Sequence, residues 1–133
     1  MKPLDKDKAM RAALWGSVLY NLGAAVVSAF PASALAQLEG FPIPVHPIYG
    51  ALLAVFALLF GGTYAWLATQ PAINRPLVFL SAVGKLAVFA VVVAFWLFGA
   101  ISWRLVFASS GDLLFGAIFC WWLIGAQPGV MPY

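Results

Sequence analysis

The stretch PLVFLSAVGKLAVFAVVVAFWLFGA, residues 76–100, is a continuous apolar run with one charged side chain, that of Lys85. A helix needs about 20 mostly apolar residues to cross a bilayer, because lipid offers no partners to backbone N–H and C=O groups. The run does not alternate between apolar and polar residues, as a strand of a transmembrane barrel would. Residues 76–100 are therefore predicted to form a membrane-spanning helix.

Three more apolar runs have the same character, and they are residues 12–30, 48–69 and 105–126. Prolines separate the runs, at Pro31, in GFPIPVHP (residues 40–47) and in TQPAINRP (residues 69–76), and proline disfavours regular helix. The link TQPAINRP and the link SWR (residues 102–104) are short. They predict antiparallel hairpins of the second and third helices and of the third and fourth helices. We predict an all-α fold, with residues 1–133 forming a single transmembrane domain, an integral membrane four-helix bundle.

The composition excludes several classes of protein. Hydrophobic residues make up 65% of the 133 residues and charged residues 8%, whereas an average domain has about 25% charged residues. The mean hydropathy is +1.00. A soluble globular domain, a disordered chain and a nucleic-acid-binding protein are excluded, and the single cysteine, Cys120, excludes a disulfide scaffold. The expected partner of the surface is the lipid bilayer.

Basic residues in the short flanks predict the orientation, because they are enriched on the cytoplasmic side. Arg104 alone falls on one side, and the other side has Lys2, Lys6, Lys8, Arg11 and Arg75. Both termini are therefore expected in the cytoplasm. An alternative stays open for residues 1–36, whose basic start, apolar run and Ala34-Leu35-Ala36 also resemble a cleavable signal peptide.

Two ionisable side chains lie at membrane depth, Lys85 and Asp112, and such residues are costly in lipid and usually face the bundle interior. With a rise of 1.5 Å per residue, Lys85 lies roughly 13 Å and Asp112 roughly 21 Å from the cytoplasmic end. Helical side chains also lean towards their own N-terminus, which moves these two apart. The sequence therefore favours two separate polar levels over a direct Lys85–Asp112 ion pair, which stays the alternative.

The two levels define a candidate intramembrane polar site. The inner level combines Lys85 and Asn21 and could include Tyr20, Thr63 and Tyr64. The outer level combines Asp112, Ser109 and Ser110, with Ser28, Tyr49 and His46 near the same rim. The residues expected in a site are Asn21, Tyr20, Tyr64, Lys85, Asp112 and Ser109. They serve either to fix the helix register and assembly or to form a binding or proton-handling site.

The chain lacks the residues that most chemistry requires. Metal and haem sites need several His, Cys or carboxylate ligands, and the chain has one histidine, His46, and one cysteine. His46 lies between prolines and is predicted to be an exposed loop residue. No catalytic residue, metal or cofactor is predicted, and the sequence favours a protein that is not an enzyme.

Several residues in order along the chain resemble a family of small bacterial inner-membrane proteins with four spans, DoxX-like in layout. They are Tyr20-Asn21, Pro31, residues 38–40, the proline-rich loop, Gly61-Gly62-x-Tyr64, Pro71, Arg75, Gly84-Lys85, Gly99 and Asp112-Leu113. The resemblance implies a multi-pass protein of the bacterial inner membrane. It also implies a membrane redox system as a partner.

Three functions follow as hypotheses. The first is a non-enzymatic accessory or interaction subunit of a membrane system, as a homo-oligomer or bound to a membrane enzyme. The second is a small-solute or proton-coupled carrier that acts as an oligomer through Lys85 and Asp112. The third is a binder or enzyme for an apolar molecule held between the helices.

Overall fold

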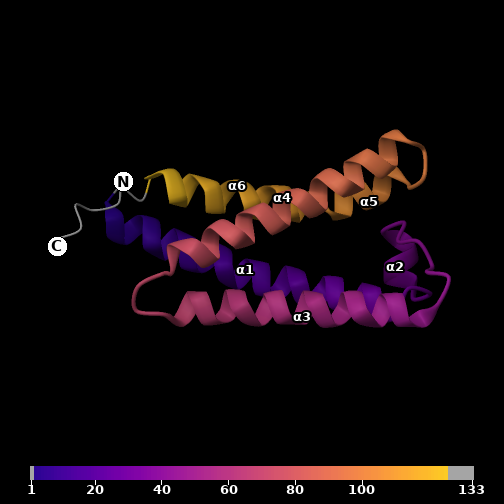
Figure 1. Ribbon diagram of the computed structural model, residues 1–133, viewed down its shortest axis with the longest axis horizontal. Helices are drawn as coiled ribbons and strands as arrows, with labels where there is room; N and C mark the ends of the chain where they lie inside the picture. Colours follow the sequence, from indigo (N-terminus) through magenta and orange to yellow (C-terminus); the bar gives the residue numbers. More distant parts are fainter. Residues whose placement is uncertain (1, 126–133) are drawn as a thin grey trace.

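The computed structural model describes residues 2–125, and the regular elements of this part are all helices (Figure 1). The all-α prediction is confirmed for these residues. The helices are α1 (Pro3–Ala29), α2 (Ala34–Leu38), α3 (Pro47–Thr69), α4 (Arg75–Leu97), α5 (Trp103–Ala108) and α6 (Ser110–Gly125). The last residue of the fourth expected run, residue 126, lies outside the described part of the chain.

Four helical segments are long and apolar enough to cross a membrane: Asp5–Ala29, Pro47–Thr69, Arg75–Leu97 and Trp103–Gly125. The first helix begins earlier than the apolar run, because the charged N-terminal segment continues the same helix from Pro3. The helix α4 ends at Leu97, and Gly99 follows with a φ of 75°, a conformation that favours glycine. The fourth segment is not one helix, since α5 and α6 are separated at Ser109.

Local side chains explain where the helices begin and end. The helix α1 ends at Ala29, just before Pro31, as predicted. The side chains of Asn74 and Ser102 accept hydrogen bonds from backbone N–H groups in the first turns of α4 and α5. His46 does the same for α3 through its Nδ1 atom, which accepts from the N–H of Ile48 at 3.1 Å. The short helix α2 was not predicted.

The long helices form two packed pairs. The helix α1 packs along α3, the helix α4 packs against α5 and α6, and α1 joins the pairs through contacts with α6. The helices α3 and α4 are joined by a short link, yet they touch at few points and diverge away from it (Figure 1). The expected antiparallel hairpin of these two helices is therefore splayed, and the bundle is open on this side.

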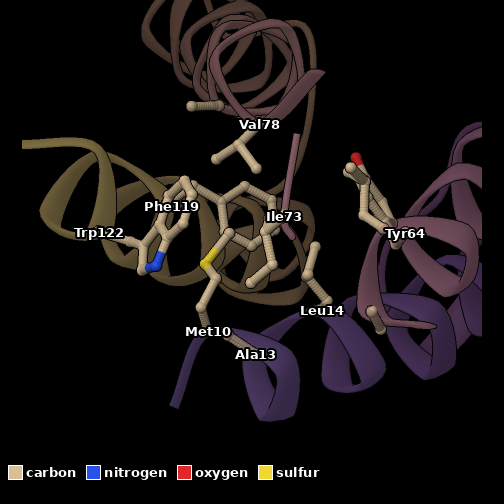
Figure 2. Packing of buried hydrophobic residues seen from close by; sticks show 11 residues of the cluster. Met10, Ala13, Leu14, Tyr64, Ile73, Val78, Phe119 and Trp122 are labelled. Carbon is tan, nitrogen blue, oxygen red and sulfur yellow. The ribbon is translucent and has the colours of Figure 1, made fainter. Parts of the chain in front are cut away.

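The hydrophobic core lies at the end of the bundle where the described chain begins and ends (Figure 1), and Figure 2 shows how its side chains pack. Its members come from all four long segments and from the link between α3 and α4. They are Met10, Ala13, Leu14, Tyr64, Leu67, Ala68, Ile73, Val78, Ala82, Phe119 and Trp122. This cluster holds the two helix pairs together at one end.

Hydrogen bonds from arginines reinforce the same end. The Arg11 guanidinium donates to the carbonyl oxygens of Ala68, at 2.8 Å, and Pro71, at 3.1 Å. Arg75 donates to the carbonyl oxygen of Leu123 at 3.0 Å. The last carbonyls of a helix lack partners within it, so cations placed there stabilise the helix ends. The end that carries the core is thus closed by both apolar and polar contacts.

Candidate functional site

Lys85 is the centre of the polar groups inside the bundle. Its side chain is 3% exposed, and its Nζ atom donates to Asp112 Oδ1 at 3.1 Å and to Asn21 Oδ1 at 3.3 Å. The amide of Asn21 in turn donates to the carbonyl oxygen of Ala57 at 3.0 Å. Helices α1, α4 and α6 each supply one side chain, and α3 supplies a backbone carbonyl. These contacts join all four long segments in one network.

The predicted separation into two polar levels is wrong, because Lys85 and Asp112 form a direct ion pair. The depth estimate assumed straight helices that cross the membrane at right angles. In the structure α4 runs obliquely past α6, and the helix that carries Asp112 restarts at Ser110 (Figure 1). The flexible stem of Lys85 covers the remaining distance. The expected contact of Lys85 with Asn21 is confirmed.

Aromatic rings surround the Lys85 ammonium on the sides that have no oxygen ligand. Its Nζ atom lies 4.9 Å from the ring centroid of Tyr64, 5.2 Å from that of Tyr20 and 5.6 Å from that of Phe115. A cation within about 6 Å of an aromatic ring is attracted by the negative face of the ring. The Lys85 ammonium is therefore in contact with a carboxylate, an amide and three aromatic rings. Lys85 and Asp112 together have no net charge.

A cavity of about 850 Å³ lies next to this network, on the side away from the core. Its walls come from α1, α3, α4, and the junction of α5 and α6, and they are mostly apolar. Lys85, Asn21 and Asp112 line it together with Tyr20, Tyr64 and Ser109, so all six residues of the predicted site face one space. The sequence had placed them at two depths, and the fold places them around one cavity.

The cavity is bounded by exposed apolar residues on one side. Leu53, Phe56 and Phe60 of α3 and Val88 and Val91 of α4 line it and are also between 40% and 57% exposed. These residues lie on the two helices that diverge in Figure 1. The cavity therefore opens between α3 and α4, towards the region that a bilayer would occupy.

The hydroxyl groups around the cavity fall into two kinds. The Tyr20 hydroxyl donates to the carbonyl oxygen of Ala108 at 2.7 Å. Those of Tyr64, Ser109 and Ser28 have no hydrogen-bond partner among residues 2–125, although these residues are 2%, 9% and 7% exposed. Buried polar groups are normally hydrogen-bonded, so these three hydroxyls are available to a bound molecule.

Other predicted members of the polar levels lie elsewhere. The hydroxyls of Thr63 and Ser110 donate to carbonyl oxygens of their own helical segments, at 2.9 Å and 2.6 Å. Tyr49 and His46 are exposed, and His46 serves as the cap of α3. These four residues are not part of the cavity lining. A polar residue in an apolar run therefore does not by itself indicate a place in the site.

Two site residues were outside the predicted set. Ser28, which was expected only near the outer rim, lines the cavity from α1. Glu39 lines it from the end of α2, and burial raises the pKa of its carboxyl above the ordinary value. The sequence offered no sign of Glu39, because it lies in a polar link whose fold against the helices depends on the short helix α2.

Within residues 2–125 no group of three or more His, Cys, Asp or Glu side chains lies close enough to hold a metal ion. No protein-family model matches the chain, and neither a curated protein nor a solved structure is significantly similar to it. The resemblance to DoxX-like proteins stays a prediction.

Proposed function

We propose that the protein binds an amphipathic molecule in the cavity between its helix pairs, with the polar part of the molecule near Lys85 and Asp112. The observation that carries this proposal is the cavity of about 850 Å³, which is apolar along its walls and polar at its inner end. Ligand pockets commonly measure about 300–1,000 Å³ and combine apolar walls with a few convergent polar groups.

The distribution of charge supports an orientation for this site. Most of the basic residues lie at the closed end of the bundle, which carries the core, and Arg104 lies at the opposite end. By the rule that basic flanks stay inside, the closed end faces the cytoplasm and the cavity lies towards the outer leaflet. We place the protein in the bacterial inner membrane with both termini in the cytoplasm.

The other two hypotheses have less support from the geometry. A carrier needs a route through the closed end, which is filled by the core cluster and the arginine contacts. An accessory subunit needs an interface, and the exposed apolar surface of residues 2–125 is equally suited to lipid. Both stay predictions.

The proposal is tested by filling the cavity. Gly84 lines it, and a Cβ atom added there meets no heavy atom within 4 Å. The backbone at this position therefore has room for a side chain, and we expect the ring of Gly84→Phe to occupy the cavity. Gly62→Phe is the matched control, because Gly62 also has open space around its Cβ position but does not line the cavity.

The measurement is mass spectrometry of the lipids that remain on the purified full chain after extraction in mild detergent. The wild type and Gly62→Phe should retain a specific molecule in near-stoichiometric amount, and Gly84→Phe should lose it. A wild type that carries the same lipid profile as Gly84→Phe would refute the proposal.

A further inference from the structure

Tyr64 lies beside the charged centre, with its ring centroid 4.9 Å from the Lys85 Nζ atom. Tyr64 is 2% exposed, lines the cavity, and has no hydrogen-bond partner within residues 2–125. Its ring is fixed by Phe119, with centroids 5.9 Å apart, and by the Lys85 ammonium. In Figure 2 the hydroxyl points away from Met10 and Leu14 of the core cluster. A rigid ring thus presents an unused donor at the inner end of the cavity.

The charged groups beside it balance each other. Lys85 donates to Asp112 and Asn21, so an anionic ligand at this place would lie beside a carboxylate that already balances the charge of Lys85. A cationic ligand would likewise lie beside the Lys85 ammonium, and either ligand would bring an unbalanced charge into the cavity. The charged pair therefore disfavours either sign of ligand charge, whereas a neutral oxygen acceptor can bond to Tyr64 without disturbing it.

The position of the entrance also favours an uncharged ligand. The cavity opens between α3 and α4, and Lys85 lies about 15 Å along the axis of α4 from Arg75, near the middle of the helix. A molecule that enters sideways at this depth must carry its polar group through hydrocarbon. A charged group there is costly, and an uncharged carbonyl is far less so.

We propose that the cavity binds the uncharged ester head of an acyl lipid, whose carbonyl accepts a hydrogen bond from Tyr64 while its acyl chain leaves between α3 and α4. This inference rests on the proposed function, and it specifies the chemical class of the ligand. The hydroxyl of Ser109, which also lines the cavity and has no hydrogen-bond partner within residues 2–125, is a further donor in the cavity wall.

The test uses four probes with the same chain length: methyl palmitate, palmitate, hexadecylamine and hexadecane. The purified full chain in detergent is incubated at neutral pH with an equimolar mixture, captured by affinity, and its bound probes are quantified by gas chromatography and mass spectrometry. The amount carried by Gly84→Phe measures what the detergent micelle takes up and is subtracted.

The wild type should prefer methyl palmitate to hexadecane by about threefold to tenfold, which is the effect of one hydrogen bond. Palmitate and hexadecylamine should bind at least about tenfold less than the ester, because each brings an unbalanced charge beside the ion pair. Tyr64→Phe should abolish the preference for the ester over the hydrocarbon. This variant loses no hydrogen bond within residues 2–125, so its folding should be intact. Tyr49→Phe, on the exposed part of α3, is the control and should keep the preference.

Three results would overturn the inference while leaving the proposed function in place. They are no preference for the ester over the hydrocarbon, a preference that persists in Tyr64→Phe, and stronger binding of the acid or the amine. If the wild type carries no more of any probe than Gly84→Phe does, the proposed function fails and this inference fails with it.

Discussion

The ion pair between Lys85 and Asp112 makes a quantitative prediction about stability. The two charged atoms are 3.1 Å apart, and the side chains are 3% and 15% exposed. At an effective dielectric constant of about 20, two unit charges at this distance attract each other by about 5 kcal/mol. The loss of water from both groups opposes this attraction, so the pair as a whole contributes little net stability. Removing one partner has a different effect, because it leaves the other charge buried and unpaired.

We expect Asp112→Asn to lower the free energy of unfolding by about 3–5 kcal/mol, because it removes the negative charge that balances the enclosed Lys85 ammonium. Lys85→Met should lower the free energy of unfolding by about 3 kcal/mol, the lower end of that range, because the Asp112 side chain keeps some exposure. The double variant has no charge at this place and should lose less than about 2 kcal/mol. The sum of the single changes would thus exceed the loss in the double variant by about 4 kcal/mol or more.

The measurement is reversible unfolding in mixed micelles, followed by circular dichroism as the fraction of denaturing detergent rises. Lys8→Met is a control for the loss of a positive charge at an exposed position. Single losses that add up within about 0.5 kcal/mol in the double variant would refute the reasoning, since independent sites behave in this way. The two side chains would then lie apart, as the helix rise alone had predicted.

Three other predictions concern the helix contacts and the mouth of the cavity. Gly50→Ala should destabilise the fold by about 2 kcal/mol in the same unfolding assay, because its Cβ atom would collide with the carbonyl oxygen of Ser28, whereas Gly62→Ala should be neutral or stabilising. Tyr20→Phe should lose about 1 kcal/mol, the contribution of one hydrogen bond, and no loss would show that its 2.7 Å contact is not stabilising. Because burial raises the pKa of Glu39, its carboxyl binds a proton more tightly in the folded than in the unfolded chain. Its contribution to stability should therefore fall as pH rises from the ordinary glutamate pKa through the raised one, and Glu39→Gln should remove this fall from a pH series of unfolding measurements.

The helices themselves could be predicted from the sequence because lipid allows few alternatives. A continuous apolar run such as residues 76–100 must satisfy its backbone internally, and prolines such as Pro31 disfavour regular helix. The six residues expected in a site line one cavity for a related reason, since polar groups in such runs tend to face protein. Their arrangement could not be predicted in the same way. Position along a helix gives a depth only when tilt is known, and neither the tilt of α4 nor the break at Ser109 has a signal in the apolar pattern.

The cavity was the least predictable feature, because it depends on which helices pack closely. The buried face of α3 includes the small residues Gly50, Ala54 and Gly61, which allow α1 to approach along the length of the helix. The buried residues of α4 extend from Val78 to Lys85, and none of residues 86–97 is buried. Bulky apolar side chains in that segment face either lipid or an internal space, and both environments require the same residue types. A pattern of hydrophobicity therefore predicts a spanning helix at α4, but it does not indicate that the buried residues of this helix end at Lys85 and that the residues beyond it line a cavity.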